Sequence, residues 1–261
     1  MVYVNPRLTD NKIRSLYDEQ YFQGKGFDKS VNYYREFTER PAQEIKECKL
    51  RLEEIRKYKS QGKLLDVGCA FGLFLEVTKE QGWEPYGLEI SSYAGNYAKQ
   101  KFGSNVLIGV LNKDVFYDDY FDVITMIEVI EHFPNPIQTL KQVYRVLKKD
   151  GIIYIQTGNI ESFKAKIAGK RWNYLTLPGH IYYFSPITIK KCLEKAGFKV
   201  LRIIPPSSHD KSRLLTLLRW VGKKINLEQP FNNFIYPLVY RLVTMREFLR
   251  SQGLKVIACK E

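Results

Sequence analysis

The chain has 261 residues, 44% of them apolar, which is enough for one large domain with a buried core. Its 41 Lys and Arg against 28 Asp and Glu give a formal charge of +13. That charge favours anionic partners, but basic residues spread over solvated faces give the same total, so it selects no partner class. Every apolar stretch is shorter than the ~20 residues of a membrane helix, and the N-terminus lacks an apolar signal core, so we expect a cytoplasmic protein.

The four cysteines lie far apart in the sequence and have no neighbouring histidine. Their spacing matches neither a zinc pattern nor a disulfide framework. We therefore expect reduced thiols and no metal site. The four are Cys48, Cys69, Cys192 and Cys259.

Residues 1–40 are rich in Tyr and Phe, with glycines between them, which is typical of irregular structure lying over a larger unit. A helix is predicted over residues 41–58, because apolar positions recur at helical spacing and Pro41 falls near the first turn. We assign residues 1–61 to an N-terminal aromatic segment followed by a covering helix.

From Gly62 onward, short apolar runs alternate with amphipathic segments. Strands that alternate with helices predict a parallel sheet covered on both faces. We expect a doubly wound α/β domain over residues 62–204, completed by residues 254–261 as a final antiparallel strand. The predicted strands are residues 64–67, 85–90, 106–108, 121–127, 152–156, 198–204 and 254–259. The predicted helices are residues 73–80, 92–102, 137–147 and 186–196, with Asp150-Gly151 separating the third helix from its strand.

Residues 205–253 form a connection that is too long for an ordinary loop. Leucines and valines recur in it at helical spacing, so we predict an inserted helical cap. The segment has eight basic residues against three acidic ones, a net charge of +5. Its apolar faces can pack against the sheet domain, pair with a second copy of the chain, or rest on an anionic membrane surface.

The strongest local signal is the turn after the first predicted strand, where Gly68, Ala70 and Gly72 follow one another at alternate positions. Small residues let backbone N–H groups at a helix start face a ligand. In a doubly wound sheet, ligands bind at the carboxyl ends of the strands, where this turn falls. The next strand carries Glu89, seventeen residues after Gly72, and its carboxylate can accept hydrogen bonds from both ribose hydroxyls of a nucleoside.

The spacing of this turn separates two nucleoside cofactors. It is not the G-x-G-x-x-G of dinucleotide sites, and Asp66 stands two residues before the first glycine. This pattern favours S-adenosylmethionine over NAD. The alternative is a plain strand, turn and helix that binds no ligand.

These residues resemble the class I S-adenosylmethionine-dependent methyltransferases, in the branch with an Asp-Val-Gly-Cys turn and a Glu-His-x-x-x-Pro stretch. The stretch is Glu131-His132 followed by Pro136, and the resemblance runs from Leu64 to about Ile204 and reaches the last strand. It implies a Rossmann-like methyltransferase sheet and transfer of a methyl group from the cofactor. The cofactor-binding residues that it implies are Asp66, Gly68, Cys69, Ala70, Gly72, Glu89, Ile90, Leu111 and Glu128.

Two departures from the family pattern bear on the cofactor. Ala70 replaces the usual middle glycine, which adds one methyl group. After the third strand, where the family often has an acidic residue or an amide that meets the adenine, this chain has Gly109-Val110-Leu111-Asn112. The adenine contact therefore stays open among these residues.

Two histidines are candidate catalytic residues. His132 follows the fourth predicted strand, on the cofactor side of the sheet, and an imidazole with an ordinary pKa of ~6.5 can accept a proton at neutral pH. His180 lies in an aromatic stretch of the long loop after the fifth strand, a position that commonly forms the acceptor pocket. Alternatively, His132 packs or caps its loop while Glu131 points to solvent, and the aromatic residues around His180 fill a subsidiary core.

The function predicted from these residues is O-methylation of a small molecule, a glycan precursor or a lipid-linked acceptor, by a cytoplasmic protein able to lie at the inner membrane surface. One alternative is methylation of nucleic acid, which the charge favours. Against it, Glu128-Val129-Ile130-Glu131 stands where amino-methylating enzymes have Asn-Pro-Pro-Tyr or Asp-Pro-Pro-Tyr. A second alternative is a non-catalytic module that binds S-adenosylmethionine, because binding residues do not prove turnover.

Overall fold

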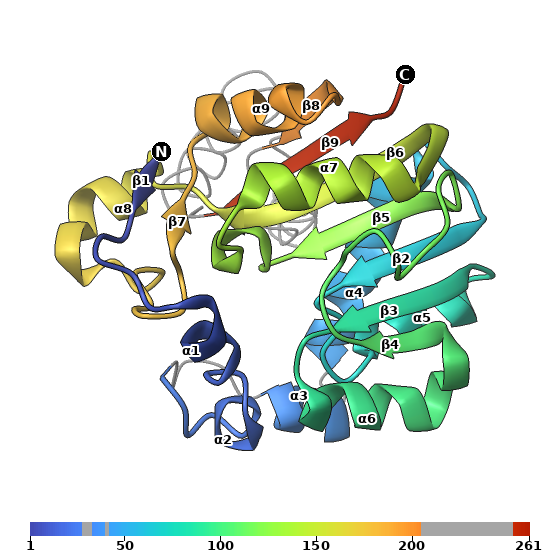
Figure 1. Ribbon diagram of the computed structural model, residues 1–261, viewed down its shortest axis with the longest axis horizontal. Helices are drawn as coiled ribbons and strands as arrows, with labels where there is room; N and C mark the ends of the chain where they lie inside the picture. Colours follow the sequence, from blue (N-terminus) through green and yellow to red (C-terminus); the bar gives the residue numbers. More distant parts are fainter. Residues whose placement is uncertain (28–32, 40–41, 205–252) are drawn as a thin grey trace, which may run out of the picture.

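A seven-stranded sheet lies at the centre of the computed structural model, which describes residues 1–27, 33–39, 42–204 and 253–261 (Figure 1). Only β9 runs antiparallel to its neighbours, and the other pairings are parallel. The doubly wound, mainly parallel sheet is thus confirmed. In spatial order the strands are β4 (Val106–Ile108), β3 (Glu84–Glu89), β2 (Lys63–Val67), β5 (Phe121–Ile127), β6 (Leu147–Gly158), β9 (Gly253–Cys259) and β8 (Lys199–Ile204).

Helices cover both faces of the sheet, and the alternation of side chains along each strand explains why both faces are apolar. In β2, Leu64 packs with residues of α4 (Ala42–Arg56) and α5 (Leu73–Glu80), whereas Leu65 belongs to the core on the opposite face. That second core includes α7 (Pro136–Val146) and α9 (Pro186–Lys195). The helix α6 (Ser92–Phe102) packs along β3 and β4.

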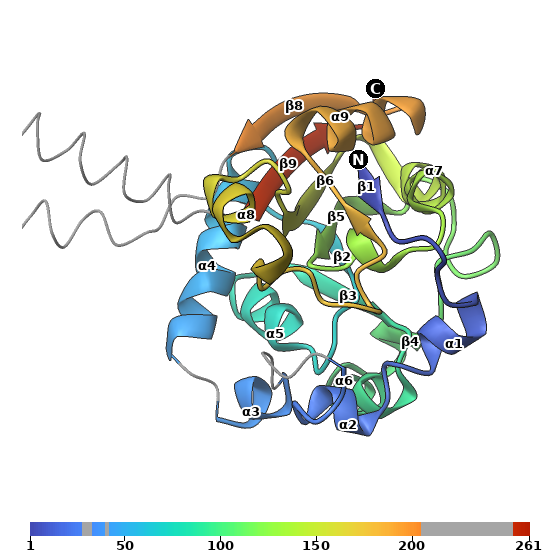
Figure 2. The ribbon, with the colours of Figure 1, turned by 90° about the vertical axis from the view of Figure 1, so that its left-hand side faces the viewer.

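The N-terminal segment runs along the carboxyl edge of the parallel strands. Figure 2 looks onto this edge and shows α1 (Asp10–Arg14) and α2 (Glu19–Phe22) at its rim, with α3 (Tyr33–Thr38) beyond. The strand β1 (Val2–Tyr3) pairs antiparallel with β7 (Tyr182–Tyr183), in the loop that also carries α8 (Phe163–Ala168). Two segments far apart in the sequence therefore meet over the edge at which doubly wound sheets bind ligands.

One predicted boundary is wrong. The strand β6 begins at Leu147, directly after α7, so Asp150 and Gly151 lie inside the strand and not before it. Asp150 has a φ of +58°, and the pairing with β5 jumps from Leu147 to Ile152, which marks a bulge. An Asp-Gly pair predicts a turn because both residues tolerate a left-handed backbone conformation. A bulge can require the same conformation.

The predicted helical cap lies almost wholly outside the described residues, which end at Ile204 and resume at Gly253. Within the described ranges, no helix combines the length and the apolar composition needed to cross a membrane.

Candidate functional site

A cavity lies at the carboxyl ends of β2, β3 and β5, beneath the N-terminal segment. Its volume is about 170 Å³. The sheet side of its wall includes Gly68, Ala70, Glu89, Ile90, Gly109 and Glu128. The covering side includes Ile13, Tyr17, Tyr21, Phe22 and Tyr33. The strand ends thus present two carboxylates among mostly apolar residues, and the cover is mainly aromatic, with Asp10 and Arg14 at its edge.

Left-handed backbone shapes the turn after β2. Gly68 and Gly72 have φ values of +81° and +84°, and Ala70 adopts +46°. A Cβ atom at Gly68 would lie 2.7 Å from Cγ2 of Val129, so a larger residue would push against the loop after β5. The amide of Gly68 donates to the carbonyl of Leu88 at 2.7 Å, which ties the turn to β3. Backbone rather than side chains therefore forms this wall of the cavity.

Glu89 is the buried carboxylate of the cavity, with 4% of its surface exposed. The backbone N–H of Ala70 donates to its Oε2 at 2.9 Å, and that of Ser91 to its Oε1 at 2.8 Å. Burial raises the pKa of Glu89, and hydrogen bonds from the backbone N–H groups of Ser91, Ala70 and Ile90 oppose that rise. The two oxygens offer about four acceptor positions, so three backbone donors leave room for a ligand hydroxyl. This fixed orientation suits a carboxylate that accepts from a ribose.

Asp66, which the resemblance assigns to the methionine part of the cofactor, is not among the residues that line the cavity. It is buried, and the hydroxyl of Thr125 donates to its Oδ1 at 2.6 Å. Burial raises the pKa of Asp66 to about 7, although the hydrogen bond from Thr125 opposes the shift. In this structure Asp66 links β2 to β5 behind the cavity.

The raised pKa of Asp66 makes stability depend on pH. The folded state holds a proton that the unfolded chain has already released, so the free energy of unfolding falls as pH rises from 3.8 to about 7. The full loss is roughly 4 kcal/mol. Asp66→Asn keeps the shape of the side chain without this titration. Urea unfolding at pH 5 and at pH 8 gives the free energy of unfolding at each pH. Between the two, this free energy should fall clearly less in the variant than in the wild type, and equal decreases would contradict the burial argument.

The other residues assigned to the cofactor divide into two groups. Ile90 and Glu128 line the cavity, as do Gly68, Ala70 and Glu89. Cys69 packs instead in a core cluster with Leu75, Gly72 stands at the N-terminal end of α5, and Leu111 packs against the core beside α7. On the third-strand side, Gly109 and Val110 line the cavity, and a Cβ at Gly109 would meet no atom within 4 Å.

Two glutamates, the half-buried Glu128 and the buried Glu131, share one tyrosine hydroxyl beside the cavity. The hydroxyl of Tyr174 lies 2.5 Å from Oε2 of Glu128 and also contacts Oε1 of Glu131. The side chain of Gln156 donates to Glu128 at 3.0 Å, and the hydroxyl of Thr157 to Glu131 at 2.9 Å. Burial, and then the charge of Glu131, raise the pKa of Glu128. Glu131 is fully buried, so the alternative in which it points to solvent is wrong.

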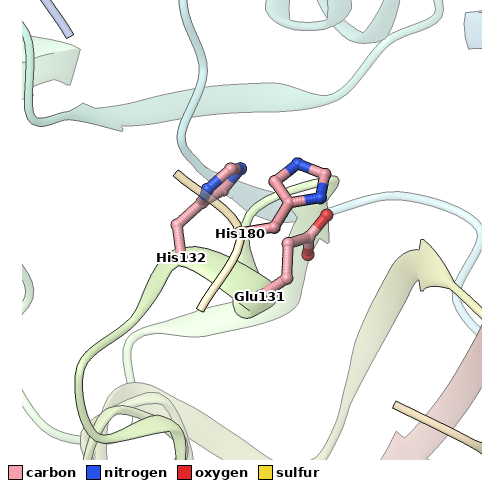
Figure 3. A group of neighbouring side chains, drawn as sticks. All are labelled: Glu131, His132 and His180. Carbon is pink, nitrogen blue, oxygen red and sulfur yellow. The ribbon is translucent and has the colours of Figure 1, made fainter. Parts of the chain in front are cut away.

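Both candidate histidines lie next to Glu131 (Figure 3). The ring centroids of His132 and His180 are 4.7 Å apart, and one potential ligand atom from each of the three residues lies within 4.8 Å of the others. His132 lines the cavity, whereas His180 does not and is buried. No metal site is expected from the sequence, yet these side chains bring together nitrogen and oxygen atoms of the kinds that bind metal ions.

The Nδ1 atoms of both rings lie at backbone carbonyls. That of His132 is 2.9 Å from the oxygen of Gly179 and 2.9 Å from the hydroxyl of Tyr17, and that of His180 is 2.8 Å from the oxygen of Tyr174. Because a carbonyl oxygen only accepts, each contact is a hydrogen bond when Nδ1 carries the proton. In the neutral imidazole the lone pair then resides on Nε2.

Tyr17, Tyr174 and Thr125 take part in the site without having been predicted to do so. Their partners lie 115, 46 and 59 residues away in the sequence, respectively. No local spacing signals such contacts. The one sequence feature that indicates Tyr17 and Tyr174 is the concentration of tyrosines in residues 1–40 and around Trp172.

The comparisons with known proteins agree with the site. Residues 34–203 match a family model described as "Methyltransferase domain". "Ubiquinone biosynthesis O-methyltransferase" of Glaesserella parasuis is 26% identical over 181 residues, which cover 63% of this chain and 75% of that protein. The protein of the same name from Coxiella burnetii is 31% identical over 155 residues, which cover 54% of this chain and 64% of the relative.

Solved structures share the fold. A SAM-dependent methyltransferase from Archaeoglobus fulgidus superposes with a TM-score of 0.58 at 23% identity, covering 87% of this chain and 98% of the other. The [4+2]-cyclase SpnF does so with a TM-score of 0.52 at 18% identity, covering 82% and 81%. The family match spans well over half of the chain. The cavity of this chain is lined by the turn of Gly68 and Ala70 and by Glu89. The chain therefore belongs to the methyltransferase-domain family and is an S-adenosylmethionine-dependent methyltransferase.

Proposed function

We propose that this enzyme methylates a hydroxyl oxygen of a small, largely apolar molecule. The observation that carries the proposal is the position of His132, which lines the same cavity as Glu89 and faces a cover rich in aromatic residues. The relatives named ubiquinone biosynthesis O-methyltransferase support oxygen as the acceptor atom. An aromatic cover stabilises an apolar acceptor by burying its surface.

The cavity offers one orientation for the cofactor. Glu89 would accept the ribose hydroxyls, Gly109 and Val110 would border the adenine, and the turn from Gly68 to Ala70 would border the methionine part. Glu128 lies beyond that turn and is fixed by Gln156 and Tyr174. This orientation points the sulfonium toward the side of the cavity that holds His132.

The reaction needs placement and one proton acceptor. S-adenosylmethionine is already a strong electrophile, so holding the acceptor oxygen in line with the methyl carbon supplies much of the rate. As the oxygen attacks, the methyl–sulfur bond breaks, its electron pair stays on sulfur, and S-adenosylhomocysteine forms. The hydroxyl proton passes to the Nε2 lone pair of His132, which the contact of Nδ1 with Gly179 orients.

Transfer of a labelled methyl group tests the proposal. The purified protein is incubated with S-adenosylmethionine labelled at the methyl group and with an extract of small molecules or, in a parallel sample, with RNA, and the products are separated by mass spectrometry. We expect one labelled, base-stable methyl ether. A label in RNA would instead favour the nucleic-acid alternative, and cofactor binding by calorimetry without any transfer would favour the non-catalytic module.

A lipid-linked acceptor and contact with an anionic membrane belong to the same proposal. The basic segment 205–253 lies outside the described residues apart from Gly253. Among the described ones, α8 exposes Phe163 and Ile167 next to the exposed Lys164 and Lys166. Apolar side chains beside basic ones favour an anionic bilayer, where each basic residue adds about 1 kcal/mol.

Sedimentation with liposomes checks this contact. We expect binding to vesicles that contain anionic lipid, release of the protein as salt is raised, and no binding to neutral vesicles. Ile167→Asp should weaken the binding, because it replaces an exposed apolar side chain with an acidic one. An absence of binding to both kinds of vesicle would contradict the membrane contact and leave the sheet domain or a second copy of the chain as the proposed partner of the apolar faces of the predicted cap.

A further inference from the structure

We propose that Glu131, His132 and His180 bind a divalent first-row transition-metal ion at the wall of the cofactor cavity. The binding is argued from the geometry of these side chains. Its catalytic role, activation of the acceptor hydroxyl, rests on the proposed function.

The distances suit a single ion. One ligand atom from each residue lies within 4.8 Å of the other two. Metal–ligand bonds of about 2.0–2.2 Å place neighbouring ligand atoms of a tetrahedral ion about 3.4 Å apart, and two trans ligands at most about 4.4 Å apart. Side-chain rotations that move these atoms by about an ångström would therefore complete the site. His132 lines the cavity, so an ion held there would be accessible to an acceptor.

The surroundings of the two imidazoles match those of metal ligands. A histidine that binds a metal through one nitrogen usually donates the N–H of the other to a carbonyl or carboxylate, which fixes the ring and its tautomer. Here Nδ1 of His132 lies 2.9 Å from the carbonyl oxygen of Gly179, and Nδ1 of His180 lies 2.8 Å from that of Tyr174. Both carbonyls belong to the loop between α8 and β7, which thus orients both rings.

The carboxylate is held as firmly as the rings. The hydroxyls of Thr157 and Tyr174 contact the two oxygens of Glu131, which is fully buried. The single proton of the Tyr174 hydroxyl cannot be donated to Glu128 and Glu131 at once. A cation beside these two carboxyl groups, one fully buried and one half-buried, would stabilise them, because buried charge needs a compensating partner.

The donor set selects the class of ion. Imidazole nitrogens suit zinc, iron, nickel and copper, whereas sites for magnesium and calcium consist of oxygen atoms. Two imidazoles and one carboxylate therefore favour a transition ion such as Zn²⁺ or Co²⁺. An acceptor hydroxyl bound to this ion would release its proton to solvent at neutral pH, and the resulting oxyanion would attack the methyl carbon as described above. The ion would then replace His132 as the means of ionising the acceptor.

Binding of Co²⁺ to the metal-free protein tests the site, because its visible absorption reports nitrogen and oxygen ligands directly. We expect about one equivalent of bound Co²⁺ in the wild type, displaced by Zn²⁺. Glu131→Gln and His180→Gln should weaken this binding by roughly tenfold or more, since each removes a ligand. Glu161→Gln, at an exposed carboxylate, should retain it.

Calorimetry with S-adenosylmethionine on the same samples shows whether each variant is folded and separates this inference from the proposed function. Wild-type protein that binds the cofactor but not Co²⁺ would overturn the metal site and leave the proposed function standing. Unchanged Co²⁺ affinity in both Glu131→Gln and His180→Gln, or loss of binding in Glu161→Gln, would also overturn it. Co²⁺ binding without methyl transfer to any hydroxyl would keep the site and reject its catalytic role.

Discussion

Replacing Glu89 by alanine should weaken the binding of S-adenosylmethionine by about tenfold or more. A hydrogen bond to a charged group contributes roughly 1.5–3 kcal/mol, and the ribose offers two hydroxyls to the two carboxylate oxygens. Because Ala70 and Ser91 already fix this carboxylate, the cofactor does not have to order it on binding. Titration calorimetry measures the change directly.

Two further variants sharpen this measurement. Glu89→Gln keeps the size of the side chain but removes the charge, and it places an amide N–H₂ against the backbone N–H of Ala70 or Ser91, so we expect a comparable loss of affinity. Glu161→Ala, at an exposed glutamate, should bind the cofactor as the wild type does. If the affinity of the folded Glu89→Ala protein were unchanged, Glu89 would only tie the turn to β3, and the ribose would bind elsewhere.

The order of strands and helices can be predicted from the sequence because apolar runs and turn residues are both local features. Strands buried on two faces read as continuous apolar runs, and the small residues after β2 mark a tight turn before a helix. Glu89 could be assigned to the site for the same reason, since it ends a strand whose carboxyl end had to face the ligand. The start of β6 could not be predicted, because Asp-Gly pairs occur both in turns and in bulges.

The contacts inside the site depend on tertiary structure. Asp66 and Val67 are neighbours at the end of β2, but only Val67 lines the cavity, while Asp66 reaches Thr125 of β5. The sequence does not reveal which of two adjacent residues at a strand end faces the ligand. Similarly, His180 meets His132 because β7 and its loop fold back onto the edge of the sheet, as the hydrogen bond from the Ile181 amide to the Glu131 carbonyl shows.

Replacing His132 by alanine should lower the turnover of a hydroxyl acceptor by roughly 10²–10⁴, the usual contribution of a positioned proton acceptor. Cofactor affinity should change little, because the contacts proposed for the cofactor are at Glu89 and at the turn of Gly68. The comparison requires kcat with the acceptor identified by labelled methyl transfer, together with calorimetry of the cofactor. Glu161→Ala, at an exposed side chain, serves as the control.

Tyr17→Phe separates the chemistry of His132 from its orientation. The variant removes the hydroxyl 2.9 Å from Nδ1 but leaves the carbonyl of Gly179 at the same distance, so the ring keeps a partner that fixes its tautomer. We therefore expect a loss of turnover much smaller than that of His132→Ala. If Tyr17→Phe and His132→Ala lowered turnover equally, the hydroxyl of Tyr17 would be required to orient the imidazole of His132. If His132→Ala retained full turnover, placement of the acceptor alone would carry the catalysis.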